Sequence, residues 1–131
     1  MSPSIVRVRD VMHPEVLCVD GMASVKDAAA VMRANNIAEL LVNKRNEDDA
    51  WGIITVMDLV KDVIVPGREG EDVSVYEVMT KPVITVPATM DIRYAIRLIY
   101  RTGVHRAPVE HLGEIVGMVT LSSLILDSNI V

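Results

Sequence analysis

The chain has 131 residues, a formal net charge of −5 and 50 % hydrophobic residues, but only 3 % aromatic residues and no Phe. Its length suits one ordinary domain that needs no metal or disulfide to stabilise it, and the abundance of aliphatic residues excludes a disordered chain. The acidic balance and the scarcity of aromatic rings argue against nucleic-acid binding, which needs many cations or stacking platforms.

Other protein classes are disfavoured by what the sequence lacks. We find no run of about 20 apolar residues that could span a membrane, and no signal peptide in residues 1–10. The one cysteine, Cys18, cannot form an internal disulfide, and its apolar neighbours indicate a small buried hydrophobe. The three histidines lack metal-ligand spacing. We therefore expect a cytoplasmic protein without a required cofactor or metal, and without nucleic-acid or membrane partners.

The sequence repeats itself after 67 residues. Four blocks keep their order in both copies at this shift: 9–12 with 76–79, 16–19 with 83–86, 24–32 with 91–99, and 37–42 with 104–109. A fifth block, 51–59 with 116–124, follows at a shift of 65, because the second copy has lost two loop residues. Such an ordered set indicates an internal duplication.

Each copy is expected to form a β-α-β-β-α unit. In the first copy, the apolar run 16–19 is typical of a buried strand. Ser24 can cap the helix that follows, and Asn35-Asn36 ends it. The counterpart of this helix ends at Gly103, a residue that tolerates the left-handed conformation.

Two strands and a helix complete the first copy. Residues 40–42 and 51–54 are expected to be strands joined by the polar turn 43–49. A second helix follows Thr55, and Pro66-Gly67 stops it.

The predicted organisation is a first repeat at residues 1–65, a charged linker at 66–77 and a second repeat at 78–131. A unit of about 50 residues buries too little surface to be stable alone. We therefore expect one α/β (α+β) module, in which the two repeats pack sheet against sheet with pseudo-twofold symmetry and share one core.

The order of elements, the segment VHRAPV at 104–109 and the junctions GIITVMD at 52–58 and GMVTLSS at 117–123 resemble tandem cystathionine-beta-synthase (CBS) domains. Such a pair is called a Bateman module, and the resemblance covers about residues 6–126. It implies a non-catalytic regulatory module that binds AMP, ADP, ATP or S-adenosylmethionine in clefts between the repeats. Binding would be transmitted to a partner protein or to a homodimer face.

The segment 55–58 has two compatible interpretations. Thr55 at the N-cap and Asp58 three residues later form a helix-capping arrangement. The resemblance adds that Asp58 accepts hydrogen bonds from ribose hydroxyls and that Thr55 lies near the sugar or phosphate. The matching candidates in the second copy are Thr120, Ser122 and Ser123. Ser123 replaces the carboxylate, so a plain cap by Thr120 is the simpler interpretation there.

The strand segment of each copy supplies the other candidates, which are Val104, His105 and Arg106 in the second copy and Ile37, Ala38 and Glu39 in the first. The resemblance implies that His105 and Arg106 face phosphate, whereas base rates favour solvated surface residues. Glu39 would repel a phosphate. In each cleft, the strand segment of the other copy would border the adenine base of the ligand.

Neither of the two implied clefts has both a carboxylate for the ribose and basic residues for the phosphate. The cleft with Asp58 would hold the ribose but has Glu39 near the phosphate, so a neutral adenosine-like group suits it. The cleft with Thr120 would have His105 and Arg106 for phosphate but no ribose carboxylate, so a phosphate-bearing ligand suits it.

We name residues 9–14 and 77–82, which precede the first strand of each copy, the leading segments. The resemblance implies that they cover the clefts and contact adenine, with His13 and Thr80 as candidates. Met12 and Met79 are interpreted instead as core residues.

Two other functions compete with ligand sensing. One is a structural dimerisation module whose clefts are vestigial. For the sensing module too we expect a homodimer, with its interface supplied by the helices that follow Ser24, Thr55, Asp91 and Thr120. The other is a small enzyme, which is disfavoured because the sequence has no Gly-rich phosphate loop and no evident Ser-His-Asp set.

Overall fold

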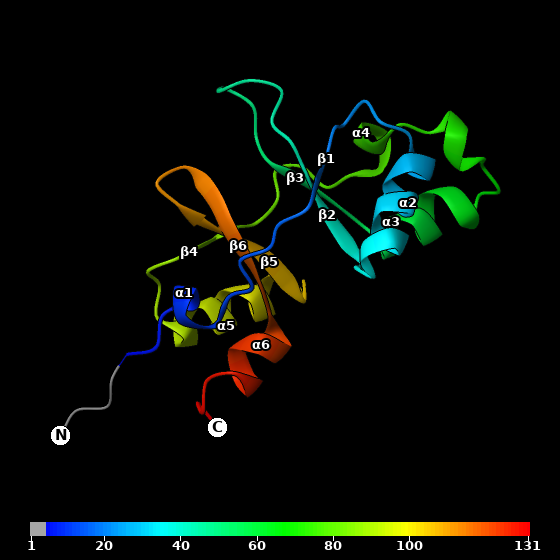
Figure 1. Ribbon diagram of the computed structural model, residues 1–131. Helices are drawn as coiled ribbons and strands as arrows, with labels where there is room; N and C mark the ends of the chain where they lie inside the picture. The colour runs from blue at the N-terminus through cyan, green and yellow to red at the C-terminus, as the bar shows by residue number, and fades with distance from the viewer. Residues whose placement is uncertain (1–4) are drawn as a thin grey trace. The chain divides into compact units, whose positions relative to one another are not determined.

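The computed structural model describes residues 5–131, which form two compact units (Figure 1). Unit 1 contains the described residues up to Val16 together with Ile84–Val131, and unit 2 contains Leu17–Val83. Each unit has one three-stranded sheet with helices, which confirms the mixed α/β class.

Unit 2 has the strand order β1-β2-β3, with β1 parallel and β3 antiparallel to the central β2. Its elements are β1 (Cys18–Val19), α2 (Val25–Asn35), β2 (Glu39–Val42), β3 (Gly52–Thr55), α3 (Val56–Leu59), the π-helix η1 (Val60–Ile64), the 3-10 helix η2 (Gly70–Asp72) and α4 (Val75–Val78). The β-α-β-β-α order expected for the first copy is therefore present.

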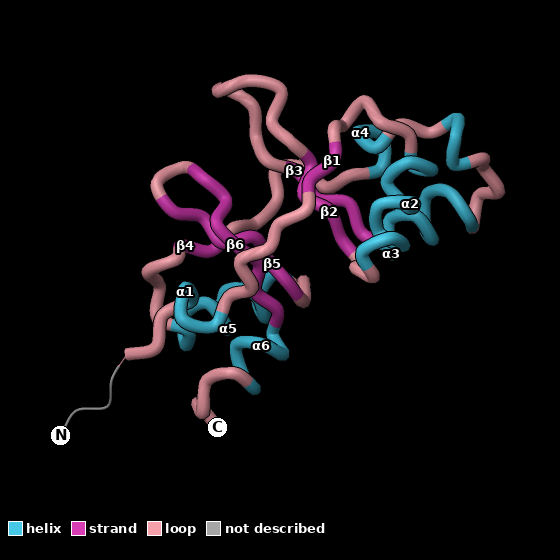
Figure 2. Tube along the Cα trace, in the orientation of Figure 1, coloured by secondary structure: helices cyan, strands magenta, loops and turns pink. Residues whose placement is uncertain are grey.

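Unit 1 repeats this topology with the strand order β4-β5-β6 (Figure 2). Its elements are α1 (Val8–Val11), β4 (Val86–Pro87), α5 (Ile92–Thr102), β5 (Arg106–His111), β6 (Glu114–Thr120) and α6 (Leu121–Leu126). The strands of its hairpin are longer than β2 and β3 of unit 2, and a bulge interrupts their register between Val109 and Glu110.

The helices begin and end at the residues that the sequence indicates. The Ser24 hydroxyl accepts a hydrogen bond of 3.0 Å from the Asp27 N–H at the start of α2. Asn36 ends α2 at a φ of 51°, and Gly103 ends α5 at a φ of 77°. The second helix of the first copy differs from expectation, because it is α-helical for one turn and then widens into η1.

Each unit has a buried aliphatic cluster of its own. In unit 2 the cluster includes the fully buried Leu40 and Ile54, and in unit 1 it includes Ile99 and Leu124. Cys18 corrects a further expectation, since it is exposed. Successive strand residues point to opposite faces, and in β1 it is Val19 that faces the core.

The leading segments pair with the third strand of the other copy. His13 and Met118 exchange two backbone hydrogen bonds of 2.8 Å, and Ile53 and Thr80 exchange two of 2.9 Å. A residue just before each leading segment is also buried in the core that the other copy forms. Val8 lies in the core of unit 1, and Val73 lies in the core of unit 2. The sequence repeats and the compact units are therefore different divisions of the chain.

Two equivalent glycines lie where the leading segments approach the sheets. A Cβ atom added at Gly117 would lie 2.7 Å from both the His13 carbonyl oxygen and the Met12 sulfur. At Gly52 the nearest atoms would be the Met79 sulfur at 3.0 Å and the Thr80 carbonyl oxygen at 3.2 Å. Glycine is therefore required most strictly at position 117, where backbone approaches backbone.

We expect Gly117→Ala to lower the free energy of unfolding by about 1–3 kcal/mol, because the methyl group forces the first leading segment away from β6. Gly52→Ala should cost less, since the flexible Met79 side chain can move. Gly70→Ala is the matched control, because its Cβ would meet nothing closer than 3.4 Å. Urea unfolding of the three variants measures the order, and a Gly117→Ala chain as stable as Gly70→Ala would contradict the close approach.

Candidate functional site

The Thr55–Asp58 motif joins β3 to α3 in unit 2. Asp58 Oδ2 accepts hydrogen bonds from the Thr55 N–H at 2.8 Å and the Thr55 hydroxyl at 3.1 Å, while the Asp58 N–H donates to Thr55 Oγ1 at 3.2 Å. The reciprocal pair is a capping box, as the spacing predicts. All the hydrogen bonds that the described residues make to the carboxylate use Oδ2, so capping leaves Oδ1 with acceptor capacity.

The matching motif at the start of α6 forms the same cap, but the hydroxyl of Ser123 takes the place of the carboxylate. Ser123 Oγ accepts from the Thr120 N–H at 3.0 Å and donates to the Thr120 carbonyl oxygen at 3.0 Å. Ser123 is only 4 % exposed. A hydroxyl has one proton to donate, and here the cap uses it. Ser122, its neighbour, is exposed.

The structure brings each motif next to the strand segment of the same copy. Glu39 lies opposite Thr55 in the β2–β3 register, and the Val56 N–H donates to the Ala38 carbonyl oxygen at 2.9 Å. In unit 1, Arg106 lies opposite Thr120, and the Leu121 N–H donates to the His105 carbonyl oxygen at 2.9 Å.

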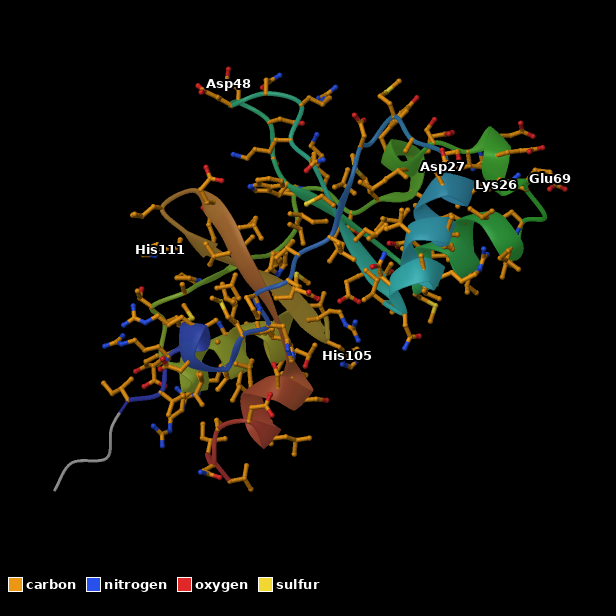
Figure 3. All side chains as sticks on the ribbon, in the orientation of Figure 1. Lys26, Asp27, Asp48, Glu69, His105 and His111 are labelled. Atoms are coloured by element: carbon orange, nitrogen blue, oxygen red, sulfur yellow. The ribbon has the colours of Figure 1, made fainter. Side chains whose placement is uncertain are left out.

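The side chains of the two strand segments differ in charge. His105 is exposed beside the start of α6 (Figure 3), and Arg106 next to it is half-buried. Val104 is exposed as well. A guanidinium and an imidazole here can donate to an anion. The first copy presents a carboxylate, Glu39, at the equivalent place.

A hollow of about 360 Å³ adjoins the strand segment in unit 2. It is lined by Ala29, Met32, Arg33, Asn36, Ile37, Ala38, Val56 and Leu59. Two predicted site residues, Ile37 and Ala38, therefore lie at one hollow between α2 and the start of α3. Arg33 and Asn36 were not predicted there, because their sequence positions at a helix end indicate only solvated polar residues.

The leading segments present their candidates to solvent. His13 and Thr80 are both exposed, with their backbones held by the third strands. Met12 packs against the core of unit 1 and Met79 against that of unit 2, which confirms their interpretation as core residues.

Within residues 5–131 no group of three or more His, Cys, Asp or Glu residues could hold a metal ion, and none of the helices has the length and apolar character that a membrane span requires. Although Cys18 is exposed, desolvation by its neighbours raises the pKa of its thiol, which leaves less of the nucleophilic thiolate at neutral pH.

A salt-bridge cluster that the sequence did not predict joins the loop between β2 and β3 to Lys81. Asp49 bonds Arg45 Nε at 3.2 Å and also the Lys81 ammonium. The hydrogen bonds from Lys81 and Arg45 hold the pKa of Asp49 well below its usual range. The sequence of residues 43–49 predicts only a polar turn, and no local pattern indicates that Lys81 contacts Asp49.

Comparison with known proteins identifies the family. The family model for the CBS domain matches twice, at residues 8–64 and 75–127. An uncharacterized protein of Methanopyrus kandleri is 30 % identical over 92 % of this chain, and a mitochondrial CBS domain-containing protein of Arabidopsis thaliana is 29 % identical over 90 %. The chain spans only 61 % and 62 % of these relatives.

Solved structures agree with the fold. A hexameric CBS-CP12 protein from bloom-forming cyanobacteria has a TM-score of 0.91 at 30 % identity, with 98 % of this chain and 75 % of that chain covered. An uncharacterized protein of Pyrococcus horikoshii has a TM-score of 0.83 at 27 % identity, with 97 % and 95 % covered. With both repeats matched by the family model, the chain belongs to the CBS domain family and carries a tandem pair of these domains.

Proposed function

We propose that the protein is a regulatory module that binds an adenine-containing ligand through the Thr55–Asp58 motif. CBS domain pairs are regulatory modules that commonly bind adenosine ligands. The observation that supports the proposal for this chain is that only one of the two Asp58 carboxylate oxygens is used by the helix cap. Oδ2 holds the cap, while Oδ1 retains acceptor capacity for the hydroxyls of a ribose.

The surroundings of Asp58 suit such a ligand. Asp58 is half-buried, so a hydrogen bond to its charge is less screened than one on an open surface. The neighbouring strand residue Glu39 disfavours a phosphate close by. Adenosine, or an adenosine ligand with a positively charged or neutral substituent, therefore fits this motif better than ATP does.

The motif of the second copy is proposed for a different part of a ligand. Its Ser123 hydroxyl is buried and used by the cap, so it offers no ribose acceptor. The side chains of His105 and Arg106 in the second copy can donate hydrogen bonds to an anion such as a phosphate, and the guanidinium of Arg106 adds a positive charge. Ligand preference should therefore be unequal between the two copies.

Titration calorimetry with adenosine, AMP, ATP and S-adenosylmethionine tests the proposal. We expect saturable binding of at least one of them, with Asp58→Asn weakening adenosine affinity about tenfold or more, because the amide removes one charged acceptor. Asn keeps an oxygen that can accept from Thr55, so the cap should survive.

The matched control is Asp27→Asn, which changes the same helix position, three residues after the N-cap, in α2. It should leave ligand affinity unchanged. A chain that gives no heat with any of the four adenine compounds would refute the ligand-sensing function.

A structural dimerisation module is the second candidate, and exposed apolar side chains favour it. Helix α3 and the following η1 present Met57 at 70 % exposure and Ile64 at 69 %. Val56 and Val60 in these helices are also exposed, as is Val65 directly after η1. Burying such side chains is worth about 1.5–3 kcal/mol each. The hexameric state of the cyanobacterial CBS-CP12 protein also supports self-association.

Sedimentation equilibrium should give a mass above the 14.4 kDa of one chain. We expect the double variant Met57→Glu/Ile64→Glu to shift the equilibrium towards monomer, because two charges would be buried without partners. Leu112→Glu, at an exposed hairpin tip, should not shift it. A wild-type chain that sediments as a monomer at high micromolar concentration would exclude this interface.

A further inference from the structure

A second hollow, of about 260 Å³, lies in unit 2 at the far end of the sheet from the Thr55–Asp58 motif. It is lined by Asp20, Gly21, Met22, Val42, Asn43, Arg45, Tyr76, Met79 and Lys81. Val42 pairs with Gly52 at one end of the β2–β3 ladder, whereas Glu39 pairs with Thr55 at the other. No predicted site residue is among the lining residues.

The hollow lies at the carboxyl ends of two parallel strands, β1 and β2, and is lined by the residues that directly follow each of them. The chain turns away from the sheet after both strands, and the hollow lies where it does so. The Asp20–Met22 turn forms one wall, held by a bond of 2.8 Å from the Met22 N–H to Asp20 Oδ1.

The floor of the hollow is apolar and close-packed. Val42 is buried, and a Cβ atom at Gly21 would already lie in contact with Val42 and Tyr76, at 3.6 and 3.5 Å. Two large side chains stand exposed at the rim, with Met22 at 74 % and Tyr76 at 52 %. A flexible thioether and an aromatic ring can close over an apolar ligand group.

The rim carries charges of opposite sign on its two flanks. Asp20 follows the outer strand β1, while Lys81 follows Thr80, which pairs with β3. Since neighbouring strands are about 4.8 Å apart and both β2 and β3 separate β1 from the Thr80 segment, the backbones of these flanks are about 14 Å apart. That spacing leaves room for a small molecule between the Asp20 and Lys81 side chains.

Asp49 organises the cationic flank. Its side chain is only 7 % exposed and is shared between Arg45 and Lys81. One carboxylate between two cations leaves a net charge of +1, and the Lys81 ammonium still has protons to donate after bonding Asp49. The cationic flank can therefore bind one carboxylate, and Asp20 can accept from one ammonium.

We propose that this hollow binds a small zwitterion with an apolar body, which is the chemistry of a hydrophobic α-amino acid. The carboxylate would be held by Lys81 and Arg45, the ammonium by Asp20, and the side chain by Val42, Met79 and Tyr76. The size agrees, because drug-sized ligands occupy about 300–1,000 Å³ and this hollow is smaller. The site is independent of the adenine-ligand site.

Methyl NMR of the full chain with ¹³C-methyl methionine provides a direct readout, since Met22 and Met79 line the hollow. L-leucine and L-phenylalanine should each shift these two resonances saturably, and should leave that of Met57, on α3, in place. The N-acetyl and the amide derivatives remove one charge each, so both should bind about tenfold more weakly or worse.

Two variants test the charges separately. Asp20→Asn keeps an oxygen for the Met22 N–H, and Lys81→Met leaves Asp49 its bond with Arg45. Each should weaken binding of the free amino acids about tenfold or more. Asp48→Asn and Lys26→Met change charges of the same sign at positions that do not line the hollow, and should bind as wild type. Figure 3 shows Asp48 in the loop between β2 and β3 and Lys26 on α2.

The proposal is overturned if neither amino acid shifts Met22 and Met79, or if the N-acetyl and amide derivatives bind as well as the free amino acids. It is equally overturned if Asp20→Asn, folded by its NMR spectrum, binds like wild type. The adenine titration is a separate measurement, so failure here leaves the proposed function standing.

Discussion

The composition of both compact units depends on the pairing of each leading segment with the third strand of the other copy. Four backbone hydrogen bonds mark the two bridges, and each is worth only about 0.5–1.5 kcal/mol. The apolar residues that come with them matter more. Val8 and Val75 are completely buried in the core of a unit made mainly of the other repeat. At about 1.5–3 kcal/mol for each buried side chain, packing outweighs the bridges, and neither core is complete within one repeat.

Local features of the fold could be predicted from the sequence, whereas long-range pairing could not. The caps at Ser24 and Thr55 and the stops at Asn36 and Gly103 follow from the chemistry of single residues. The pairing of His13 with Met118 spans most of the chain and leaves no local pattern. Cys18 shows the same limit on a small scale, because a two-residue strand has no alternation from which to infer the buried face.

The candidate site shows how a duplicated backbone can diverge in chemistry. Both copies retain the same cap, so Asp58 and Ser123 are equivalent for folding. They differ in what remains after capping, because the carboxylate of Asp58 has a second oxygen whereas the single hydroxyl of Ser123 both donates and accepts within the cap. The motif was recognisable from spacing, but the burial of Ser123 and the bonding of a single oxygen of Asp58 depend on packing that sequence does not display. The Asp49 cluster was missed for the same reason, because its partner Lys81 lies in the other repeat.

The two-part composition of unit 1 has a topological consequence. Unit 2 is one continuous segment, Leu17–Val83, inserted between the two parts of unit 1. The chain therefore passes between the units twice, after Val16 and after Val83, and both described ends of the chain belong to unit 1. Any protein fused at either end is anchored to the same unit, and a cut at one crossing leaves the units covalently joined through the other. Unit 2, which carries Asp58 and the proposed amino-acid hollow, is therefore joined covalently to a fused partner only through those two crossings.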